Sequence, residues 1–279
     1  MRASSRARGR PPASILDRVA ERTFFGTIRV AILLAILAFV ALGAWLDHRR
    51  STDWDTTLRV TVYPIAAGTD TATRQYVAAL DDGAFDAAEE FLAMEARRHG
   101  IGIEEPVRIR VSRAAPGLPP AAPADPGPFN VAVWSLRMRH WAWSIAASDP
   151  LPTPDVQVFA LFHPADGTSA VPDSLGLSKG LIAVTHLYAG DEAAGSNQVV
   201  LVHELLHTLG ATDKYEPATG QPLVPVGLGD PSLEPRYPQH EAEIMAGRIA
   251  VSAREAEIPS SLENTNVGPT TAREIGWPR

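Results

Sequence analysis

The pattern of apolar and polar positions separates an apolar N-terminal segment from a longer mixed part of the chain. Residues 30–46 form an uninterrupted apolar run of 17 residues without a charge. As a helix this run spans about 26 Å, and Phe24 and Phe25 extend it towards the ~30 Å of a bilayer core. It has no polar face, unlike a surface helix of a soluble protein. The pattern therefore predicts a transmembrane anchor over 30–46, after a basic tail over 1–29 and before a polar tether over 47–56.

Residues 57–279 alternate between strand-like and helix-like patterns and are predicted to form one domain. Short runs that alternate apolar and polar positions, or that are rich in β-branched residues, indicate strands, and apolar residues at helical spacing indicate helices. This order predicts an α+β fold in which helices pack on a sheet. The predicted strands are 58–65, 107–111, 156–162 and 181–188, and the predicted helices are 71–98 with a break at 81–83, a helix that ends at Gly210, and a closing helix over 269–277 anchored by Trp277.

Two stretches are less regular. Residues 114–128 are the most proline-rich of the chain and cannot form a regular hydrogen-bonded element. We interpret them as a surface loop, because the residues between the tether and this stretch are too few to form a core of their own. Within 129–145, Val131, Val133 and Ser135 alternate with other residues and favour a strand. Three tryptophans of this stretch are expected in the core or at the rim of a cleft: Trp134, Trp141 and Trp143.

The strongest chemical signal is the segment 203–213, which reads HELLHTLGATD. His203 and His207 are four residues apart, so on a helix they project from the same face, one turn apart, and can reach one ion. Zinc (Zn2+) is the expected metal, because imidazole and carboxylate ligands suit it and a catalytic site keeps a position for water. Glu204 is placed to take a proton from that water. The alternative is a surface helix with two solvated histidines.

The third metal ligand is predicted to follow the end of this helix. Gly210 stops the helix, because a residue without Cβ adopts the left-handed conformation at little steric cost. The chain can then turn back and bring Asp213 to the metal. Other carboxylates downstream are rivals for this position: Glu216, Glu241 and Glu243.

The segment 203–213 resembles the zinc-binding signature of metzincin peptidases, HExxHxxGxxH/D, in the variant with aspartate as third ligand, as in snapalysin-type secreted proteases. The resemblance is thus to a snapalysin-like or matrixin-like metzincin. Metzincins also have a methionine turn below the metal, and 243–247 (EIMAG), with Met245, resembles one. The resemblance implies a zinc endopeptidase acting on protein or peptide substrates, with a twisted mixed sheet, an active-site helix and an irregular C-terminal subdomain. It also implies a strand at the cleft edge that pairs with extended substrate, for which 181–188 is the candidate.

The residues leave two functions open. The first is hydrolysis of peptide bonds by metal-activated water, with Glu204 as general base. The second is a membrane-tethered zinc-binding scaffold without catalytic activity. Glu204 favours hydrolysis, because it is not needed to hold the metal. The donor that would stabilise the developing oxyanion is not fixed, and its candidates are Tyr215, Tyr237 and His240.

Charge and composition set the expected location and exclude some partners. Residues 1–29 hold seven arginines against Asp17 and Glu21, a net charge of +5, and the chain carries −7, so the remainder carries −7 − 5 = −12. The positive-inside bias predicts a cytoplasmic N-terminus and an extracytoplasmic domain; secretion after cleavage of a signal peptide is the alternative. An acidic body argues against nucleic acid as a partner. The absence of cysteine excludes thiolate ligands and a cysteine nucleophile.

Smaller predictions concern the helix that carries the histidines and two other histidines. Ser196 or Asn197 is the expected N-cap. His140 and His186 are interpreted as structural residues rather than metal ligands. Four residues form the stripe of this helix that is expected to face the core: Val199, Val202, Leu206 and Leu209.

Overall fold

The computed structural model divides between Leu46 and Asp47 into two compact units, of which the second is described below. The predicted anchor lies outside the described residues, apart from Val30 and Leu34. In the part of the chain that is described, no helix is long and apolar enough to cross a membrane. The structure describes these residues: 30, 34, 52–114, 117–125, 127–165, 175–177 and 181–278.

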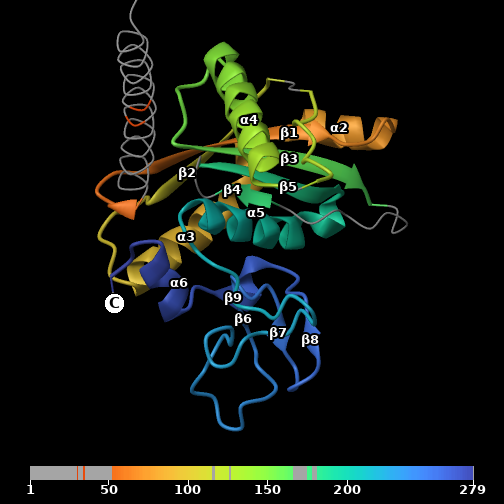
Figure 1. Cartoon of the computed structure of the whole chain (residues 1–279). Helices are drawn as coiled ribbons and strands as arrows, with labels where there is room; N and C mark the ends of the chain where they lie inside the picture. The colour runs from red at the N-terminus through yellow and green to blue at the C-terminus, as the bar shows by residue number, and fades with distance from the viewer. Residues whose placement is uncertain are drawn as a thin grey trace, which may run out of the picture. The chain divides into compact units, whose positions relative to one another are not determined.

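The centre of the second unit is a five-stranded sheet in the order β2-β1-β3-β5-β4 (Figure 1). The first four strands of this order pair in parallel, and β4 pairs with β5 in the antiparallel direction. The four strands expected from the sequence are therefore confirmed, and the sheet is mixed. The bounds are β1 Leu58–Ala66, β2 Val107–Val111, β3 Val156–Pro164, β4 Leu175–Leu177 and β5 Ile182–Ala189.

Helices cover both faces of the sheet (Figure 1). Successive side chains of a strand point to opposite faces, and β3 shows this clearly: Val158 and Phe162 belong to one core, Phe159 and Leu161 to the other. Because both faces are covered, the central strands are buried almost throughout. The first core is closed by α2 Thr71–Ala79, the 3-10 turn η1 Asp82–Phe85, α3 Asp86–Arg98 and α5 Ala194–Thr208, and the second by α4 Pro128–Ser148.

The predicted strand within 129–145 is wrong, because this stretch belongs to the helix α4. Pro128 occupies the first turn of α4, where the missing N–H of proline costs nothing and its fixed φ suits a helix. Met138 and Ala142, four residues apart, are fully buried against the sheet. Most of the other side chains of α4 are exposed or half-buried, so its apolar residues show no clear period. The short alternation over 131–135 was therefore misleading.

The three tryptophans of α4 have three different roles. Trp141 packs against the ring of Phe159 in the sheet, at a centroid distance of 4.3 Å. The indole N–H of Trp134 donates to the carbonyl of Pro120 at 2.9 Å. This bond holds the proline-rich loop, whose described residues form no helix or strand, as expected. Trp143 is 65% exposed and lies neither in the core nor beside the residues of the metal motif.

The prediction that 181–188 forms the edge of the cleft is also wrong. This segment is β5, which lies between β3 and β4 in the sheet. The edge position next to β5 is taken by β4, which pairs Leu177 with Ile182 and Leu175 with Val184. A strand of three residues is too short to give a periodic signal in the sequence, so its presence was not expected.

The C-terminal part of the chain is irregular, as predicted, and ends in the short helix α6. Trp277 is buried and packs edge-to-face on Trp54 at a centroid distance of 5.5 Å, while the Trp54 indole N–H donates to the carbonyl of Ile275 at 2.7 Å. Trp277 therefore anchors this end as expected, whereas Trp54, expected in a polar tether, is part of the core. The short elements are β6 Ala242–Glu243, β7 Ile249–Ala250, β8 Ala256–Glu257, η3 Leu262–Asn264, β9 Thr265–Asn266 and α6 Pro269–Glu274.

Candidate metal centre

The helix α5 carries the histidine motif and begins earlier than expected. It follows the 3-10 turn η2 Asp191–Ala193 directly, so neither Ser196 nor Asn197 is its N-cap. Asn197 instead joins α5 to β5: its amide N–H donates to the Tyr188 carbonyl at 2.8 Å, and its amide oxygen accepts from the Tyr188 N–H at 3.0 Å. The expected core-facing stripe is confirmed, because all four residues are buried: Val199, Val202, Leu206 and Leu209.

Gly210 ends α5 as predicted, with φ of 108°. The Gly210 N–H donates to the carbonyl of His207, and the Ala211 N–H reaches back to the carbonyl of Leu206 at 3.0 Å. This pattern satisfies carbonyls at the end of the helix and reverses the chain. Because of the reversal, Asp213 returns to the face of α5 that carries His203 and His207.

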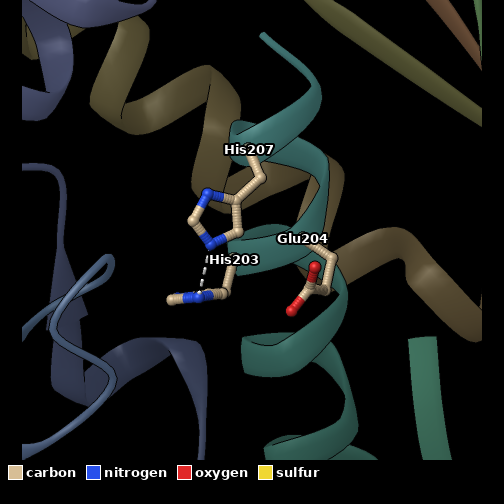
Figure 2. Close-up of side chains that lie close together, drawn as sticks. All are labelled: His203, Glu204 and His207. Carbon is tan, nitrogen blue, oxygen red and sulfur yellow. Dashed lines mark hydrogen bonds between the residues drawn. The ribbon is translucent and has the colours of Figure 1, made fainter. Parts of the chain in front are cut away.

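Three side chains of the motif meet at one point. The Nε2 atoms of His203 and His207 lie 3.0 Å apart (Figure 2), and the Oδ1 atom of Asp213 lies 3.3 Å from the first and 3.1 Å from the second. Ligand atoms about 2.0–2.1 Å from a tetrahedral zinc ion lie about 3.3–3.4 Å from one another. The three atoms are therefore spaced as three ligands of a single tetrahedral ion would be, with the fourth position left open.

The other nitrogen of each imidazole fixes which atom faces this point. The Nδ1 atom of His203 lies 2.9 Å from the carbonyl of Ile244, and that of His207 lies 2.8 Å from the carbonyl of Ala211. A carbonyl oxygen only accepts hydrogen bonds, so both Nδ1 atoms carry the hydrogen. With the hydrogen on Nδ1, a neutral ring would direct the lone pair of its Nε2 atom to the shared point, which the Asp213 carboxylate also faces. Such a group of electron-pair donors could hold a metal ion, and metal-bound histidines commonly make outer contacts of this kind.

The hydrogen bond between His207 and Asp213 shifts the pKa of each group. Burial lowers the pKa of His207, but its hydrogen bonds with Asp213 and with the carbonyl of Ala211 outweigh this effect, so the net shift is upward. Burial raises the pKa of Asp213, but the hydrogen bonds from both histidines outweigh this effect, so the pKa lies below its ordinary value. The carboxylate of Asp213 therefore stays ionised and available to a metal.

Glu204 lies beside His203 and His207. It is buried, and its Oε2 atom has no hydrogen-bond partner among the described residues. Burial raises the pKa of this carboxyl, against the opposing charges of His203 and His207. A carboxylate oxygen of Glu204 and one nitrogen of each histidine lie within 4.8 Å of one another. The Oδ1 atom of Asp213 lies 3.1–3.3 Å from both Nε2 atoms, so Asp213 could serve as a third ligand while Glu204 could contact a water molecule in the fourth position.

The methionine turn of the sequence analysis lies directly against this site. Met245 is fully buried, and the carbonyl of the preceding Ile244 accepts the hydrogen bond from His203. The turn is held by the buried carboxylate of Glu243, which accepts from the N–H groups of Met245 at 2.8 Å and Ala246 at 3.1 Å. Its other oxygen accepts from the hydroxyl of Thr271 at 2.6 Å. Glu243 is therefore a structural anchor and not a rival metal ligand.

The remaining rivals of Asp213 are not at the metal centre either. The carboxylate of Glu241 accepts from the side-chain amide of Asn266 at 2.7 Å, and Glu216 is exposed on a turn.

Of the three candidates for oxyanion donor, only Tyr215 follows the segment 203–213 directly, whereas His240 is exposed in a later loop that also contains Tyr237.

The other histidines are placed elsewhere. His140 is exposed on α4 and stacks on Trp143 at a centroid distance of 5.9 Å. The Nδ1 atom of His186 on β5 lies 2.8 Å from Nε2 of His163 on β3. Neither residue contributes to the cluster of His203 and its neighbours, in agreement with their interpretation as structural.

A group of residues that sequence reasoning missed holds Asp213 in place. Glu274 of α6 accepts hydrogen bonds from the Thr212 N–H at 2.9 Å, from the Thr212 hydroxyl at 2.9 Å and from Nζ of Lys214 at 2.7 Å. Lys214 is 3% exposed, and its backbone N–H also donates to the carbonyl of Met245 at 2.9 Å. Thr212 and Lys214, the two neighbours of Asp213, are thus both hydrogen-bonded to Glu274 of α6. Lys214 is also hydrogen-bonded to the methionine turn.

We predict that Glu274→Gln lowers the free energy of unfolding by about 2–3 kcal/mol and weakens zinc binding about tenfold. The change leaves the buried ammonium of Lys214 without its carboxylate, and residues behind metal ligands commonly affect affinity by this factor. Urea denaturation and zinc competition against a chelating dye measure the two effects. Glu263→Gln, at an exposed position of η3, is the matched control. A stability loss with unchanged zinc affinity would restrict Glu274 to a role in the fold.

Comparison with known proteins adds no family assignment. No protein-family model matches the chain, and no curated protein matches it in sequence. What the site can do is therefore inferred from the geometry of His203, Glu204, His207 and Asp213.

Proposed function

We propose that this chain is a zinc-dependent endopeptidase, with His203, His207 and Asp213 as metal ligands and Glu204 as general base. The observation that carries the proposal is the convergence of two lone pairs and one carboxylate oxygen on a single point, beside a buried carboxylate oxygen without a partner. The resemblance of the motif to metzincins supports it. So do the mixed sheet, the helix under the site and the buried methionine turn.

Each group of the site has a separate role in the proposed hydrolysis. Zinc, when bound, supplies a Lewis acid for the scissile carbonyl and lowers the pKa of water that it contacts. Glu204 takes a proton from the attacking water and returns it to the leaving amine. Burial raises the pKa of Glu204, which brings it closer to neutral pH, where an acid–base catalyst is most effective. The carbonyls of Ile244 and Ala211 keep both histidines in the orientation and tautomer that a metal ligand needs.

The proposed location follows from the sequence of the N-terminal part. Residues 30–46 are apolar and follow seven arginines, which favours a single-pass anchor with the N-terminus in the cytoplasm and residues 47–279 on the other side. Secretion after cleavage would place the same domain outside the cell. Extraction of membranes with alkaline carbonate distinguishes the two, because only an anchored chain stays with the membrane.

The proposal is tested with the purified full-length chain. We expect about one equivalent of zinc per chain by elemental analysis, and cleavage of denatured casein that stops when a chelator removes the metal and returns when zinc is added. Zinc binding without cleavage of any denatured substrate would favour the scaffold function. Absence of transition-metal binding at neutral pH would contradict both functions.

A further inference from the structure

A pocket with a polar lining and a volume of about 560 Å³ lies between residues 215–220 and 246–248. Both segments continue directly from the candidate metal centre. The first begins two residues after Asp213, a distance that the chain covers in at most about 7 Å. The second follows Met245, whose carbonyl accepts a hydrogen bond from the Lys214 N–H at 2.9 Å. The walls of the pocket therefore begin next to the segments that carry Asp213 and Met245.

Arg248 is the charged residue of this pocket, and Gly220 gives it room. Gly220 has a φ of 66°, a conformation that glycine adopts without strain. A Cβ at Gly220 would lie 3.2 Å from Nε and 3.5 Å from Cζ of Arg248. The guanidinium thus lies close over the backbone of Gly220, in contact with the turn that forms one wall. A side chain at position 220 would push it away.

Arg248 has no acidic partner within ion-pair distance in the part of the chain that the structure describes. In the described ranges, its half-buried side chain makes no ion pair or hydrogen bond. The lining of the pocket contains no carboxylate, so the cation of Arg248 faces it without an acidic neighbour in that lining. A guanidinium presents donors in a fixed planar fork, which matches a carboxylate in a bidentate manner. The pocket therefore has the chemistry of a carboxylate-binding site.

We propose that this pocket binds a carboxylate of the substrate through Arg248 and so sets the specificity of the proposed peptidase, on whose function this inference rests. The carboxylate belongs either to an aspartate or glutamate close to the scissile bond or to the C-terminus of a short peptide. Both present the same two oxygens to the guanidinium. They differ in what surrounds the carboxylate, so peptide design separates them.

The experiment uses the zinc-loaded full-length chain with Glu204→Gln, which keeps the ligands and does not turn over. Three pools of fluorescent hexapeptides are compared by anisotropy: glutamate at one position with an amidated end, glutamine there with an amidated end, and glutamine there with a free carboxylate. We expect one of the acidic pools to bind about ten- to a hundredfold more tightly than the neutral pool, as charged hydrogen bonds commonly provide. The acidic pool that binds more tightly identifies the source of the carboxylate.

Arg248→Ala, in the same background, should remove this preference, and Arg248→Lys should keep part of it because the charge remains without the planar fork. Arg254→Ala, at an exposed position outside the pocket, is the control and should change nothing. Thermal unfolding of each variant verifies that it is folded. Equal binding of all three pools, or a preference that survives Arg248→Ala, would overturn the inference.

The two proposals fail in different ways. If the unmodified chain cleaves casein but Arg248→Ala leaves the peptide preference unchanged, the pocket assignment is wrong and the peptidase stands. If carboxylate binding depends on Arg248 but no substrate is cleaved, the pocket stands as a binding site and the proposed hydrolysis is wrong.

Discussion

Glu204→Gln should abolish peptide hydrolysis while the chain keeps its zinc. Glutamine has nearly the same shape but cannot take a proton from water, and general bases contribute about 10²–10⁴-fold to the rate. We therefore expect kcat to fall by at least about a hundredfold, with little change in the metal content. Cleavage of a fluorogenic peptide and elemental analysis of the same preparation measure both quantities.

The matched control is Glu192→Gln, an exposed glutamate of η2 just before the same helix, which should leave the rate unchanged. Loss of zinc together with activity in Glu204→Gln would show that Glu204 is a ligand and not the base. Full activity in this variant would refute the proposed acid–base role.

Asp213→Ala should reduce bound zinc well below one equivalent. Two imidazoles remain, and a site with two protein ligands binds zinc much more weakly than one with three. The variant also leaves the Nε2 atoms of His203 and His207 without the carboxylate oxygen 3.1–3.3 Å away. We expect the zinc affinity to fall by about a hundredfold or more, since even residues behind the ligands contribute about 10–100-fold. Dialysis against a chelator of known affinity, followed by elemental analysis, gives the value.

Glu216→Ala serves as the control for Asp213→Ala, because Glu216 is the nearest rival carboxylate in the chain and is exposed on a turn. It should keep a full equivalent of zinc. Stoichiometric zinc in Asp213→Ala, or loss of zinc in Glu216→Ala, would mean that the third ligand is assigned incorrectly.

The local part of the candidate site could be predicted from the sequence because it depends on helix geometry. The spacing of His203 and His207 determines that they share a face, and Gly210 determines where the helix stops. Asp213 follows the stop by three residues, so its return to the histidines is a consequence of a short turn. All four expected strands agree with the observed strands to within two residues at each end, because their apolar runs are bounded by polar, glycine-rich or proline-rich segments.

The remaining features depend on contacts between distant parts of the chain. Glu274 holds the neighbours of Asp213 from about sixty residues away. The one sign of this contact in the sequence is Lys214, one of two lysines in the chain, which stands next to Asp213. Asparagine favours the N-cap position, which predicts a cap at Asn197. In the structure, hydrogen bonds between the Asn197 side chain and the backbone of Tyr188 place it inside α5 instead. The helix α4 was misread because it covers the sheet with few fully buried side chains.

The terminal helix α6 belongs to the metal centre even though it contributes no ligand. The hydroxyl of Thr271 donates a hydrogen bond to Glu243, whose carboxylate holds the methionine turn. Glu274 accepts hydrogen bonds from both neighbours of Asp213. Proteolytic trimming from position 269 onwards would therefore disconnect the supports of a site whose ligands are more than fifty residues upstream.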